Sequence, residues 1–348
     1  MSKRARIAVA QDRSGWHDRF IDALRQRRDA GLPFDYASVN LDADDWIDSV
    51  GPFDAVLWKP HYMGIAPVWH FKEKVYFMES FLGKVVVPNF KTIWHFESKV
   101  AQTWLFRHGN VSTPRTFASF DLKDAQGGLE EMTMPLVFKA SHGAGGVNVR
   151  LIRKRSEARN LIDKILCQQE WEQAKGTASS RMAVLRSLTK KWFSAKCFRY
   201  LLHRERDDVV YWQEFVKDNL ADLRITVIGD STAFAFWRHN RPGDFRASGS
   251  GLIDYDRPVP EECVRYCIGI NRQFGFDSMA YDLLFKDQGF VINEMSYGYV
   301  DKAVFNAPGF YTMKEGTAMA FTRRHVWPQD VWVEWVLRRI GIPALPHL

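Results

Sequence analysis

The sequence has little cysteine: only four of its 348 residues, and no two of them form a CxxC pair. They stand at Cys167, Cys197, Cys263 and Cys267. No histidines accompany them at the spacing of zinc ligands, so neither a zinc site nor a disulfide framework is indicated. This scarcity is typical of a protein from a reducing compartment such as the cytoplasm.

Long apolar runs are also missing. Near the N-terminus, basic residues precede only the short run Ile7 to Ala10, which is too brief for a signal peptide or a membrane span, and no longer run follows. We therefore expect a cytoplasmic protein. The sequence also offers no convincing Ser/His/Asp or Cys/His arrangement, although it contains ten histidines.

The usual nucleotide-binding loops are absent from the most glycine-rich stretch, PLVFKASHGAGGVNV at 135–149. After Gly143 the sixth motif position is Asn148, where a dinucleotide-binding fingerprint requires glycine, and no Gly-Lys-Ser/Thr follows as in a Walker A loop. The pattern instead predicts a buried strand over 136–138, which places Lys139 at its end, and a glycine-rich hairpin. Such a hairpin can bind phosphates through backbone N–H groups, but a tight turn without a ligand uses the same glycines.

The composition is that of a folded globular protein. Hydrophobic residues make up 46% and charged residues 26%, and the length suggests two or three subdomains. The net charge of +7 favours an anionic partner such as a nucleotide, an acidic glycan, nucleic acid or a phospholipid surface. The thirteen tryptophans fit a large core or a carbohydrate-binding surface.

Alternating strand-like and helix-like stretches predict a parallel α/β unit over residues 1–95. Its strands are expected at RIAVA, FDYASVNL, FDAVLW and KVVVPN, with helices over 18–28 and 68–82. A second lobe is expected over 96–208 and a third over 209–348.

The second lobe begins with a predicted helix over 97–108, which carries Lys99 in its first turn. An extended segment and a loop with Gly127 and Gly128 lead to the strand of Lys139. A basic stretch follows at 175–206. It fits an amphipathic helix on an anionic membrane or acidic polymer, or equally a solvated helix that caps the fold.

The third lobe is predicted to begin with an antiparallel meander over 210–256, followed by a helix over 260–274. The strands MAYDLLF and GFVINEMSY should then form a hairpin in which Asp282 faces Glu294. A buried carboxylate needs a cation or a donor, which here is either Mg²⁺ or an ion pair with Arg238 or Arg224. Beyond Val300 the chain is expected to be irregular and then helical over 331–339.

The order of these features is more specific than any one of them: a helix lysine, a strand lysine with a glycine loop, QEFV, DLR, GDFRASGSG, a strand aspartate and NEMSYG. Over residues 85–328 the chain resembles the ATP-grasp superfamily. The strings NRPGDFRASGSG and EMSYG are similar to the branch found in capsule and surface-polysaccharide biosynthesis, and RimK-like amino-acid ligases are more distant relatives. The resemblance implies an α/β ATP-grasp fold, with α+β lobes, preceded by a parallel α/β pre-ATP-grasp domain.

The resemblance also implies roles for individual residues. Two lysines would contact the α- and β-phosphates of ATP, a lid would close over the β- and γ-phosphates, a hinge strand would read adenine, and Asp222 would hold the ribose. The lysines are Lys99 and Lys139, the lid contains Ser141, Gly143, Ala144, Gly145, Gly146 and Val147, and the hinge is Gln213, Glu214, Phe215 and Val216. Asp282, Glu294 and Ser296 would hold Mg²⁺, although the family usually has asparagine at the last position, which puts a second metal ion in doubt.

The reaction that the resemblance implies is ATP-dependent ligation of a carboxylate to an amine through an acylphosphate. Arg238, Arg241 and Arg246 would stabilise the developing charge. The carboxylate is expected to be a uronic acid of a surface polysaccharide or its nucleotide-sugar precursor, and the amine an amino acid or other small amine. Two alternatives are a RimK-like peptide or amino-acid ligase and a non-catalytic protein that binds a nucleotide or polyanion. No nucleic-acid partner is expected, and contact with a membrane or acidic glycan is left open.

Overall fold

The computed structural model describes residues 4–12, 14–60, 68–140, 149–167, 209–287, 289–313 and 318–343. The chain forms two compact units. Unit 1 comprises Met1–Phe96, Leu105–Ser112 and Asp218–Leu348, and unit 2 comprises Glu97–Trp104 and Thr113–Lys217. The proposed lid and the basic stretch at 175–206 lie outside the described residues. The division into three domains stays a prediction.

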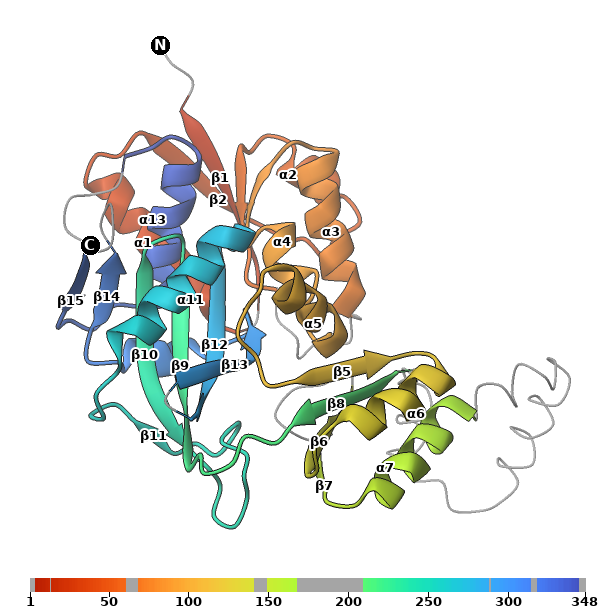
Figure 1. The fold of residues 1–348 in the computed structure, drawn as a ribbon. Helices are drawn as coiled ribbons and strands as arrows, with labels where there is room; N and C mark the ends of the chain where they lie inside the picture. The colour runs from red at the N-terminus through yellow and green to blue at the C-terminus, as the bar shows by residue number, and fades with distance from the viewer. Residues whose placement is uncertain are drawn as a thin grey trace, which may run out of the picture. The chain divides into compact units, whose positions relative to one another are not determined.

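The first sheet in unit 1 is parallel, as predicted, with strand order β2-β1-β3-β4. Its strands are β1 (Ala5–Ala10), β2 (Phe34–Val39), β3 (Ala55–Leu57) and β4 (Val85–Val87). Helices cover both faces: α1 (Trp16–Asp29), α2 (Trp46–Val50), α3 (Val68–Ser80), α4 (Phe90–Ile93) and α13 (Pro328–Arg339). Side chains alternate along β1, so Ile7 and Val9 pack with α1 and α13, whereas Ala8 and Ala10 face the core that contains α3. Figure 1 shows α1 and α13 side by side.

The C-terminal helix α13 therefore completes the core of the N-terminal sheet. Trp332, Val336 and Leu337 are fully buried in the same cluster as Ile7 and Leu57. A buried ion pair reinforces this packing, because Nε of Arg27 on α1 donates to Glu334 on α13 at 2.5 Å. The helix predicted over 331–339 is thus confirmed, with an additional turn at its start.

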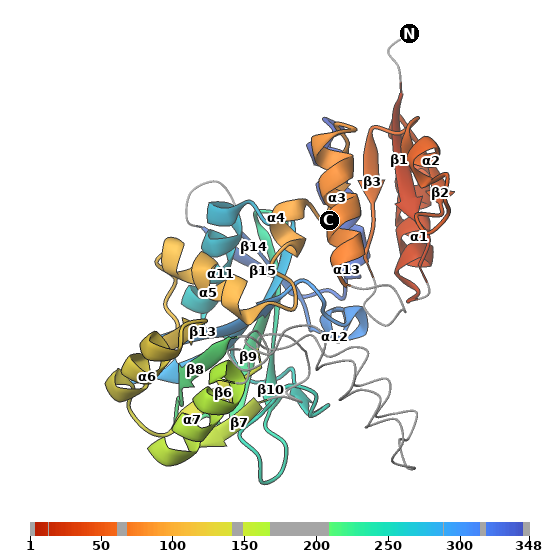
Figure 2. The same cartoon turned by 90° about the vertical axis from the view of Figure 1, so that its right-hand side faces the viewer.

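Unit 2 contains a four-stranded antiparallel sheet in the order β5-β8-β6-β7. Its strands are β5 (Thr116–Ser119), β6 (Leu136–Lys139), β7 (Val149–Ile152) and β8 (Val210–Glu214). One face packs on α6 (Leu122–Glu131) and α7 (Arg155–Ile162), which the π-helix η1 (Asp163–Cys167) extends. On the opposite side, Val100 of α5 (Lys99–His108) packs against Tyr211 of β8. Figure 2 shows α6 and α7 beside this sheet.

A third sheet, in unit 1, has seven strands in the order β13-β12-β9-β10-β14-β15, with β11 paired to β10. The strands are β9 (Ala221–Ile228), β10 (Thr232–His239), β11 (Ile253–Asp254), β12 (Ser278–Lys286), β13 (Gly289–Ser296), β14 (Phe310–Met313) and β15 (Met319–Thr322). Helix α11 (Glu261–Phe274) covers one face through Val264, Cys267 and Ile268. The short helix α12 (Asp301–Phe305) and α13 cover one end of the other face.

Three local predictions are wrong. Strand β8 joins β5 and β6 in unit 2, so the predicted meander holds only for β9 and β10. The segment with Gly127 and Gly128 is part of α6 and not a loop. The region after Val300 is not irregular, because it forms α12, β14 and β15. The predicted fold class is correct: the molecule combines a parallel α/β sheet with two antiparallel sheets.

Several other expectations can be compared with the described residues. Five tryptophans are buried in the cores, which supports the core interpretation for them: Trp16, Trp58, Trp212, Trp237 and Trp332. Cys263 and Cys267 are free and buried. None of the helices in the described ranges is both long enough and apolar enough to cross a lipid bilayer.

The two glycines of α6 provide a matched test of packing. A Cβ on Gly128 would lie 2.2 Å from the Phe117 ring of β5, whereas a Cβ on Gly127 would meet nothing within 4 Å. We expect Gly128→Ala to lower the free energy of unfolding by about 1–3 kcal/mol through overpacking. Gly127→Ala should raise it by up to about 1 kcal/mol, because alanine is the better helix former. Urea unfolding followed by tryptophan fluorescence would measure both, and equal effects would contradict this packing argument.

Candidate active site

One face of the third sheet carries a row of charged side chains on neighbouring strands. Asp282 on β12 lies directly opposite Glu294 on β13 and Arg224 on β9, and Asp222 on β9 lies opposite Arg238 on β10. The sequence produces this row by alternation, because Tyr281 and Leu283 on either side of Asp282 point into the core beneath α11. The predicted pairing of Asp282 with Glu294 is confirmed.

Two arginines and two aspartates of this row form one buried ion network. Arg224 donates from Nε and Nη2 to the two oxygens of Asp282, at 2.7 and 2.8 Å. Nε of Arg238 donates to Oδ1 of Asp222 at 2.7 Å, and Nη2 of Arg238 lies 2.8 Å from Oδ2 of Asp282. The ion pairs with Arg224 and Arg238, which were the alternative to a metal at Asp282, are therefore both present.

The network separates the acidities of its two carboxyl groups. Burial raises the pKa of Asp222 to about 6; the Asp282 charge acts in the same direction, and Arg238 opposes both. Burial also disfavours ionised Asp282, but Arg224 and Arg238 outweigh it and hold the pKa of Asp282 below its ordinary value. The difference follows from the contacts, since Asp282 is bound by two guanidinium groups and Asp222 by one.

Glu294 is half-buried beside this network and differs from it in having no partner. Within the described ranges its carboxylate forms no hydrogen bond or ion pair. A register shift between Asp282 and Leu283 leaves Asn293 as an extra residue in β13 just before Glu294, and such bulges often redirect side chains at functional sites. Two residues on, the hydroxyl oxygen of Ser296 accepts a hydrogen bond from the Gly298 N–H at 3.0 Å.

These oxygens suit a hard divalent cation. Glu294 is unpartnered among the described residues, Asp282 is adjacent, and Ser296 adds a hydroxyl, so the donor set fits Mg²⁺ better than a softer metal. No cluster of three or more His, Cys, Asp or Glu side chains that could hold a metal occurs in the described part of the chain. A cation here would need further ligands, and Mg²⁺ commonly takes them from substrate phosphates and water.

Two of the three predicted catalytic arginines lie on the loop after β10, and their contacts tie that loop together. Nε of Arg246 donates to both oxygens of Asp244, at 3.0 and 2.9 Å. Nη2 of Arg241 donates to the Ser248 carbonyl at 2.7 Å. Asp244 raises the pKa of Arg246, which is charged in any case. The third arginine, Arg238, is part of the buried network.

The two predicted ATP-binding lysines lie in unit 2, on elements that both adjoin β8. Lys139 ends β6, which pairs with β8, and Lys99 begins α5, whose Val100 packs on Tyr211. Lys139 shares with Gln213 the sheet face that α6 and α7 leave uncovered. Both lysine side chains are buried.

The predicted hinge strand corresponds to β8 and the two residues after it. Gln213 is buried and donates from Nε2 to the Thr116 hydroxyl at 3.3 Å. β8 ends at Glu214, and the chain leaves unit 2 after Lys217. In the described part of the chain, no hydrogen bond reaches the backbone of the buried Val216, so its N–H and C=O are available to a ligand edge.

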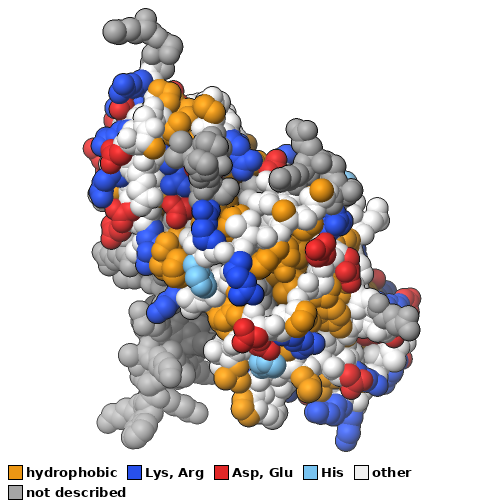
Figure 3. Space-filling view, turned by 90° about the vertical axis from the view of Figure 1, so that its left-hand side faces the viewer, with side chains coloured by type: hydrophobic (Ala, Val, Ile, Leu, Met, Phe, Trp, Pro, Cys, Tyr) orange, Lys and Arg blue, Asp and Glu red, His pale blue; other side chains and the backbone are white. Residues whose placement is uncertain are grey.

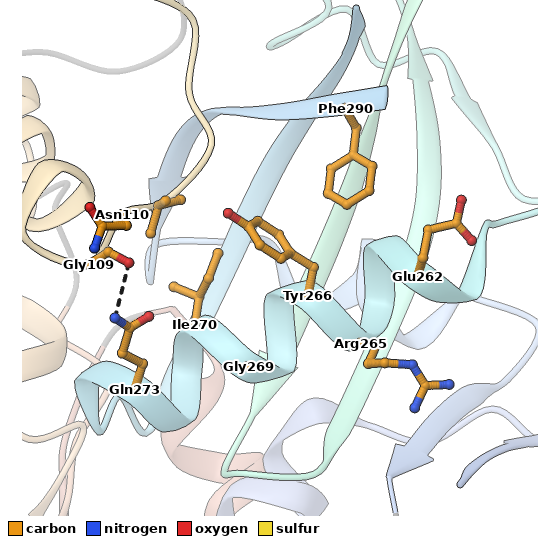
Figure 4. A pocket seen from close by; sticks show the side chains of 10 residues that line it. Gly109, Asn110, Glu262, Arg265, Tyr266, Gly269, Ile270, Gln273 and Phe290 are labelled. Atoms are coloured by element: carbon orange, nitrogen blue, oxygen red, sulfur yellow. Dashed lines mark hydrogen bonds between the residues drawn. The ribbon is translucent and has the colours of Figure 1, made fainter. Parts of the chain in front are cut away.

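A separate hollow of about 550 Å³ lies on the side of unit 1 that carries α11. Tyr266 and Ile270 of α11 and Phe290 of β13 line it, beside the turn at Gly109 (Figure 4). Gln273 closes one end by donating from Nε2 to the Gly109 carbonyl at 3.1 Å. This hollow does not belong to the charged face of the sheet, because α11 covers the opposite face.

The molecular face in Figure 3 bears on the predicted polyanion contact. Charged side chains of both signs surround a central apolar area there, and neither sign dominates. The predicted contact rests on the basic stretch, which is outside the described residues.

Sequence reasoning gave too small a role to Arg224. It was considered only as an ion-pair partner, yet it is the one arginine directly opposite Asp282. The signal was present in DLR, because Asp222 and Arg224 are two residues apart on a strand and must therefore share a face.

Comparisons with known proteins bear on the fold. No family model matches the chain. The α-aminoadipate–LysW ligase LysX of Saccharolobus solfataricus is 25% identical over 221 residues, which cover 63% of this chain and 68% of LysX. Among solved structures, the RimK domain protein ATP-grasp from Sphaerobacter thermophilus aligns with a TM-score of 0.56 and 16% identity, covering 86% of this chain and 94% of that one. The ATP-grasp ligase PsnB, complexed with minimal precursor, Mg and ADP, aligns with a TM-score of 0.51 and 13% identity, covering 96% and 97%.

The chain thus has the ATP-grasp fold. Within that fold it resembles RimK-like ligases and LysX, while a particular likeness to capsule-biosynthesis enzymes stays a prediction.

The ion network predicts opposite pH responses for its two carboxylates. The folded state favours ionised Asp282, so its stabilisation is present above the unfolded pKa and is lost as the pH falls through the lower folded pKa. Asp282→Asn should lower the free energy of unfolding by about 3–5 kcal/mol at about pH 7, because it removes one partner of a buried network. This loss should shrink in acid.

Asp222 should behave in the reverse way. The folded state favours its protonated form, so its contribution is present below the unfolded pKa and is lost as the pH rises through about 6. Asp222→Asn resembles the protonated form and should gain stability relative to the wild type between about pH 4 and pH 7. Denaturant titrations across this range measure both variants, and parallel pH profiles would show that the two acidities are not separated.

Proposed function

We propose that the protein is an ATP-dependent ligase that joins a carboxylate to an amine. The observation that carries the proposal is the charged face of the third sheet within an ATP-grasp fold. There Glu294, which has no partner among the described residues, adjoins a buried aspartate–arginine network. Relatives with this fold include ligases with bound nucleotide and Mg. Retention of both lysines and of Asp282 and Glu294 argues against a non-catalytic binding protein.

Unit 2 supplies the phosphate and adenine contacts in this proposal. Lys99 and Lys139 bind the α- and β-phosphates through charge-assisted hydrogen bonds. The backbone of the hinge, and of Val216 in particular, reads the adenine edge. The contacts predicted from residues 141–147 to the β- and γ-phosphates lie outside the described residues. Asp222 is assigned to the ribose, although both of its oxygens already bind Arg238, so ribose contact requires sharing that carboxylate.

Unit 1 supplies fixed positive charge for the reacting groups. In Arg224 and Arg238 the Nη1 nitrogen makes no hydrogen bond to the described residues, while Nε and Nη2 bind the aspartates. The carboxylates thus hold each guanidinium with one edge available to a phosphate or carboxylate oxygen. Charge fixed in advance stabilises a transition state without reorganisation at the moment of reaction.

Asp282, Glu294 and Ser296 are the residues that would hold Mg²⁺. When bound, the ion would neutralise charge on the β- and γ-phosphates of ATP. Glu294 contributes a carboxylate without a competing partner among the described residues, whereas Asp282 would share its oxygens with Arg224 and Arg238.

The reaction has two balanced steps. A carboxylate oxygen attacks the γ-phosphorus of ATP, the bond to the β-phosphate oxygen breaks, and ADP leaves with its electron pair. A neutral amine then attacks the acyl carbon of the acylphosphate, inorganic phosphate departs, and the nitrogen loses a proton to form the amide. Arg238 and Arg246 lower the barriers by stabilising charge on the transferred phosphoryl group and on the departing phosphate.

The substrate class best supported is an amino acid or a peptide. LysX is named for a ligation of α-aminoadipate, and PsnB is complexed with a precursor. The predicted uronic acid of a surface polysaccharide rests on the resemblance of NRPGDFRASGSG and EMSYG alone. Release of ADP with amino-acid or peptide carboxylates, but not with uronic acids, would decide between the two classes.

Hydroxylamine trapping tests the mechanism. With ATP, Mg²⁺ and the correct carboxylate but no amine, hydroxamate should accumulate in the wild type. Arg246→Ala should reduce its rate by about 10²-fold or more, the loss expected on removing one transition-state donor. Equal hydroxamate from the variant would place Arg246 outside the site. A carboxylate that supports ligation but yields none in the wild type would contradict the acylphosphate.

Glu294→Gln tests the metal assignment. Because Glu294 has no partner among the described residues, the variant should unfold at the same midpoint as the wild type. It should lose most ADP release, and the remaining activity should require a higher Mg²⁺ concentration. Asp287→Asn is a matched control, since Asp287 is exposed in the turn of the same hairpin with a φ of 55°, which asparagine accepts. Full activity in Glu294→Gln at limiting Mg²⁺ would remove Glu294 from the site.

A further inference from the structure

Lys59 lies at the carboxyl end of the N-terminal parallel sheet, two residues after β3. In the strand order β2-β1-β3-β4 the chain adds β2 on one side of β1 and β3 on the other side. In open α/β sheets, ligands bind in the crevice at such a switch point, outside the carboxyl ends of the strands. Lys59 nevertheless faces no open solvent, since only 5% of it is exposed. No role follows for it from the ATP-binding or metal-binding residues described above.

The ammonium group of Lys59 is enclosed by aromatic rings. Nζ lies 5.1 Å from the ring centroid of Trp16, 4.5 Å from that of Tyr297 and 5.3 Å from that of Tyr299. Its hydrogen bond goes to the main-chain carbonyl of Tyr297, at 2.8 Å. An ammonium has three donors, so within the described ranges Lys59 leaves two of them without an acceptor.

Nearby carboxylates do not satisfy these donors. Asp12 at the end of β1 and Asp301 at the start of α12 act on Lys59 only at a distance, and neither forms an ion pair with it. Asp12 instead accepts hydrogen bonds from the Ser14 and His17 N–H groups, and Asp301 binds Gln329 and Arg19. Burial lowers the pKa of Lys59 to about 7, and the two aspartates only partly oppose this shift. The fold therefore keeps this ammonium at a cost.

The carbonyl that Lys59 binds directly follows the candidate metal-binding strand. Tyr297 comes after Ser296, the last residue of β13, and its carbonyl also accepts the Tyr299 N–H at 3.1 Å. A Cβ on Gly298 would lie 2.9 Å from the Phe96 ring, so this turn is closely packed on its other side. Lys59 thus fixes the end of the strand that carries Glu294 and Ser296.

We propose that Lys59 is a positioning residue that holds the end of β13 so that Glu294 and Ser296 are aligned for Mg²⁺. The inference rests on the proposed function, because it assigns Lys59 to the same metal site. A lysine retained for stability would have its charge compensated. A buried lysine that leaves two donors unused among the described residues, and that binds the carbonyl directly after Ser296, fits a contribution to function made against stability.

Lys59→Met separates the two roles, because methionine fills nearly the same space without charge. We expect its thermal midpoint to equal or exceed that of the wild type, and its affinity for ADP in EDTA to be unchanged. Binding of Mn²⁺ in the presence of ADP, followed by electron paramagnetic resonance, should weaken about tenfold or more, the loss typical of removing a residue that orients metal ligands. The Mg²⁺ concentration for half-maximal ADP release should rise in parallel.

Lys84→Met is the matched control. Lys84 also donates to main-chain carbonyls, those of Gly51 and Phe53 at 2.7 and 2.6 Å, but at the other end of the same sheet. It should not alter Mn²⁺ binding. Unchanged Mn²⁺ affinity in Lys59→Met, or equal losses in both variants, would overturn the inference.

The measurements also distinguish the two proposals. If the wild type binds Mn²⁺ with ADP but forms no amide with any carboxylate and amine, the proposed ligase activity fails while the Lys59 comparison still holds. If the wild type ligates normally and Lys59→Met matches it at limiting Mg²⁺, only the Lys59 inference fails. Absence of Mn²⁺ binding in the presence of ADP to the wild type would overturn both.

Discussion

The third sheet is organised around four charged side chains that neutralise one another: Asp222, Asp282, Arg224 and Arg238. Each of these charges is wholly or partly buried, and each would be costly alone. Their placement on β9, β10 and β12 fixes the register of three adjacent strands, because a slip by one residue would turn the charges toward the core under α11. The network therefore acts as structure as well as candidate chemistry.

The same network explains how one sheet face can be both stable and reactive. Asp282 and Asp222 hold the guanidinium groups through two nitrogens each, and the third nitrogen of each arginine makes no hydrogen bond in the described part of the chain. Glu294, one strand away, stands outside this compensation among the described residues. In such a site the aspartates and arginines bind one another, whereas the carboxylate of Glu294 is the group proposed to bind a ligand. Lys59 extends the same principle. Among the described residues it uses one of its three donors, and that donor binds the carbonyl directly after the strand that carries Glu294.

The sequence predicted those parts of the fold that depend on local pattern. The hairpin of β12 and β13 was predicted because a short turn joins two apolar strands. Its facing carboxylates depend on the bulge at Asn293, since strict pairing from the turn would place Asn293 opposite Asp282. The pairing of strands far apart in the sequence was harder to predict. β8 directly precedes β9 in the sequence, yet it pairs with strands that precede it by more than 70 residues. The two glycines of α6 suggested a loop, since nothing in the sequence shows that Phe117 requires the missing side chain of Gly128.

Among the candidate site residues, the order of motifs predicted the lysines, the carboxylates and the arginines, and the structure shows how the carboxylates and Arg238 are connected. Which aspartate each of Arg224 and Arg238 binds depends on which strands are neighbours in the sheet. The residue pattern of one strand does not contain that information. Lys59 was not recognisable at all, because its partner Tyr297 is 238 residues away and its surroundings come from three separate segments.

The position of α13 has a consequence for the order in which the protein can assemble during synthesis. One face of the first sheet, formed by residues 5–87, is covered by α1 together with a helix that ends at Arg339. A ribosome therefore releases residues 5–339 before that apolar face is closed and before Arg27 meets Glu334. Domains usually mature from the N-terminus onward. Here the first sheet to be made is among the last to be finished, and its exposed face needs protection from aggregation until the final helix arrives.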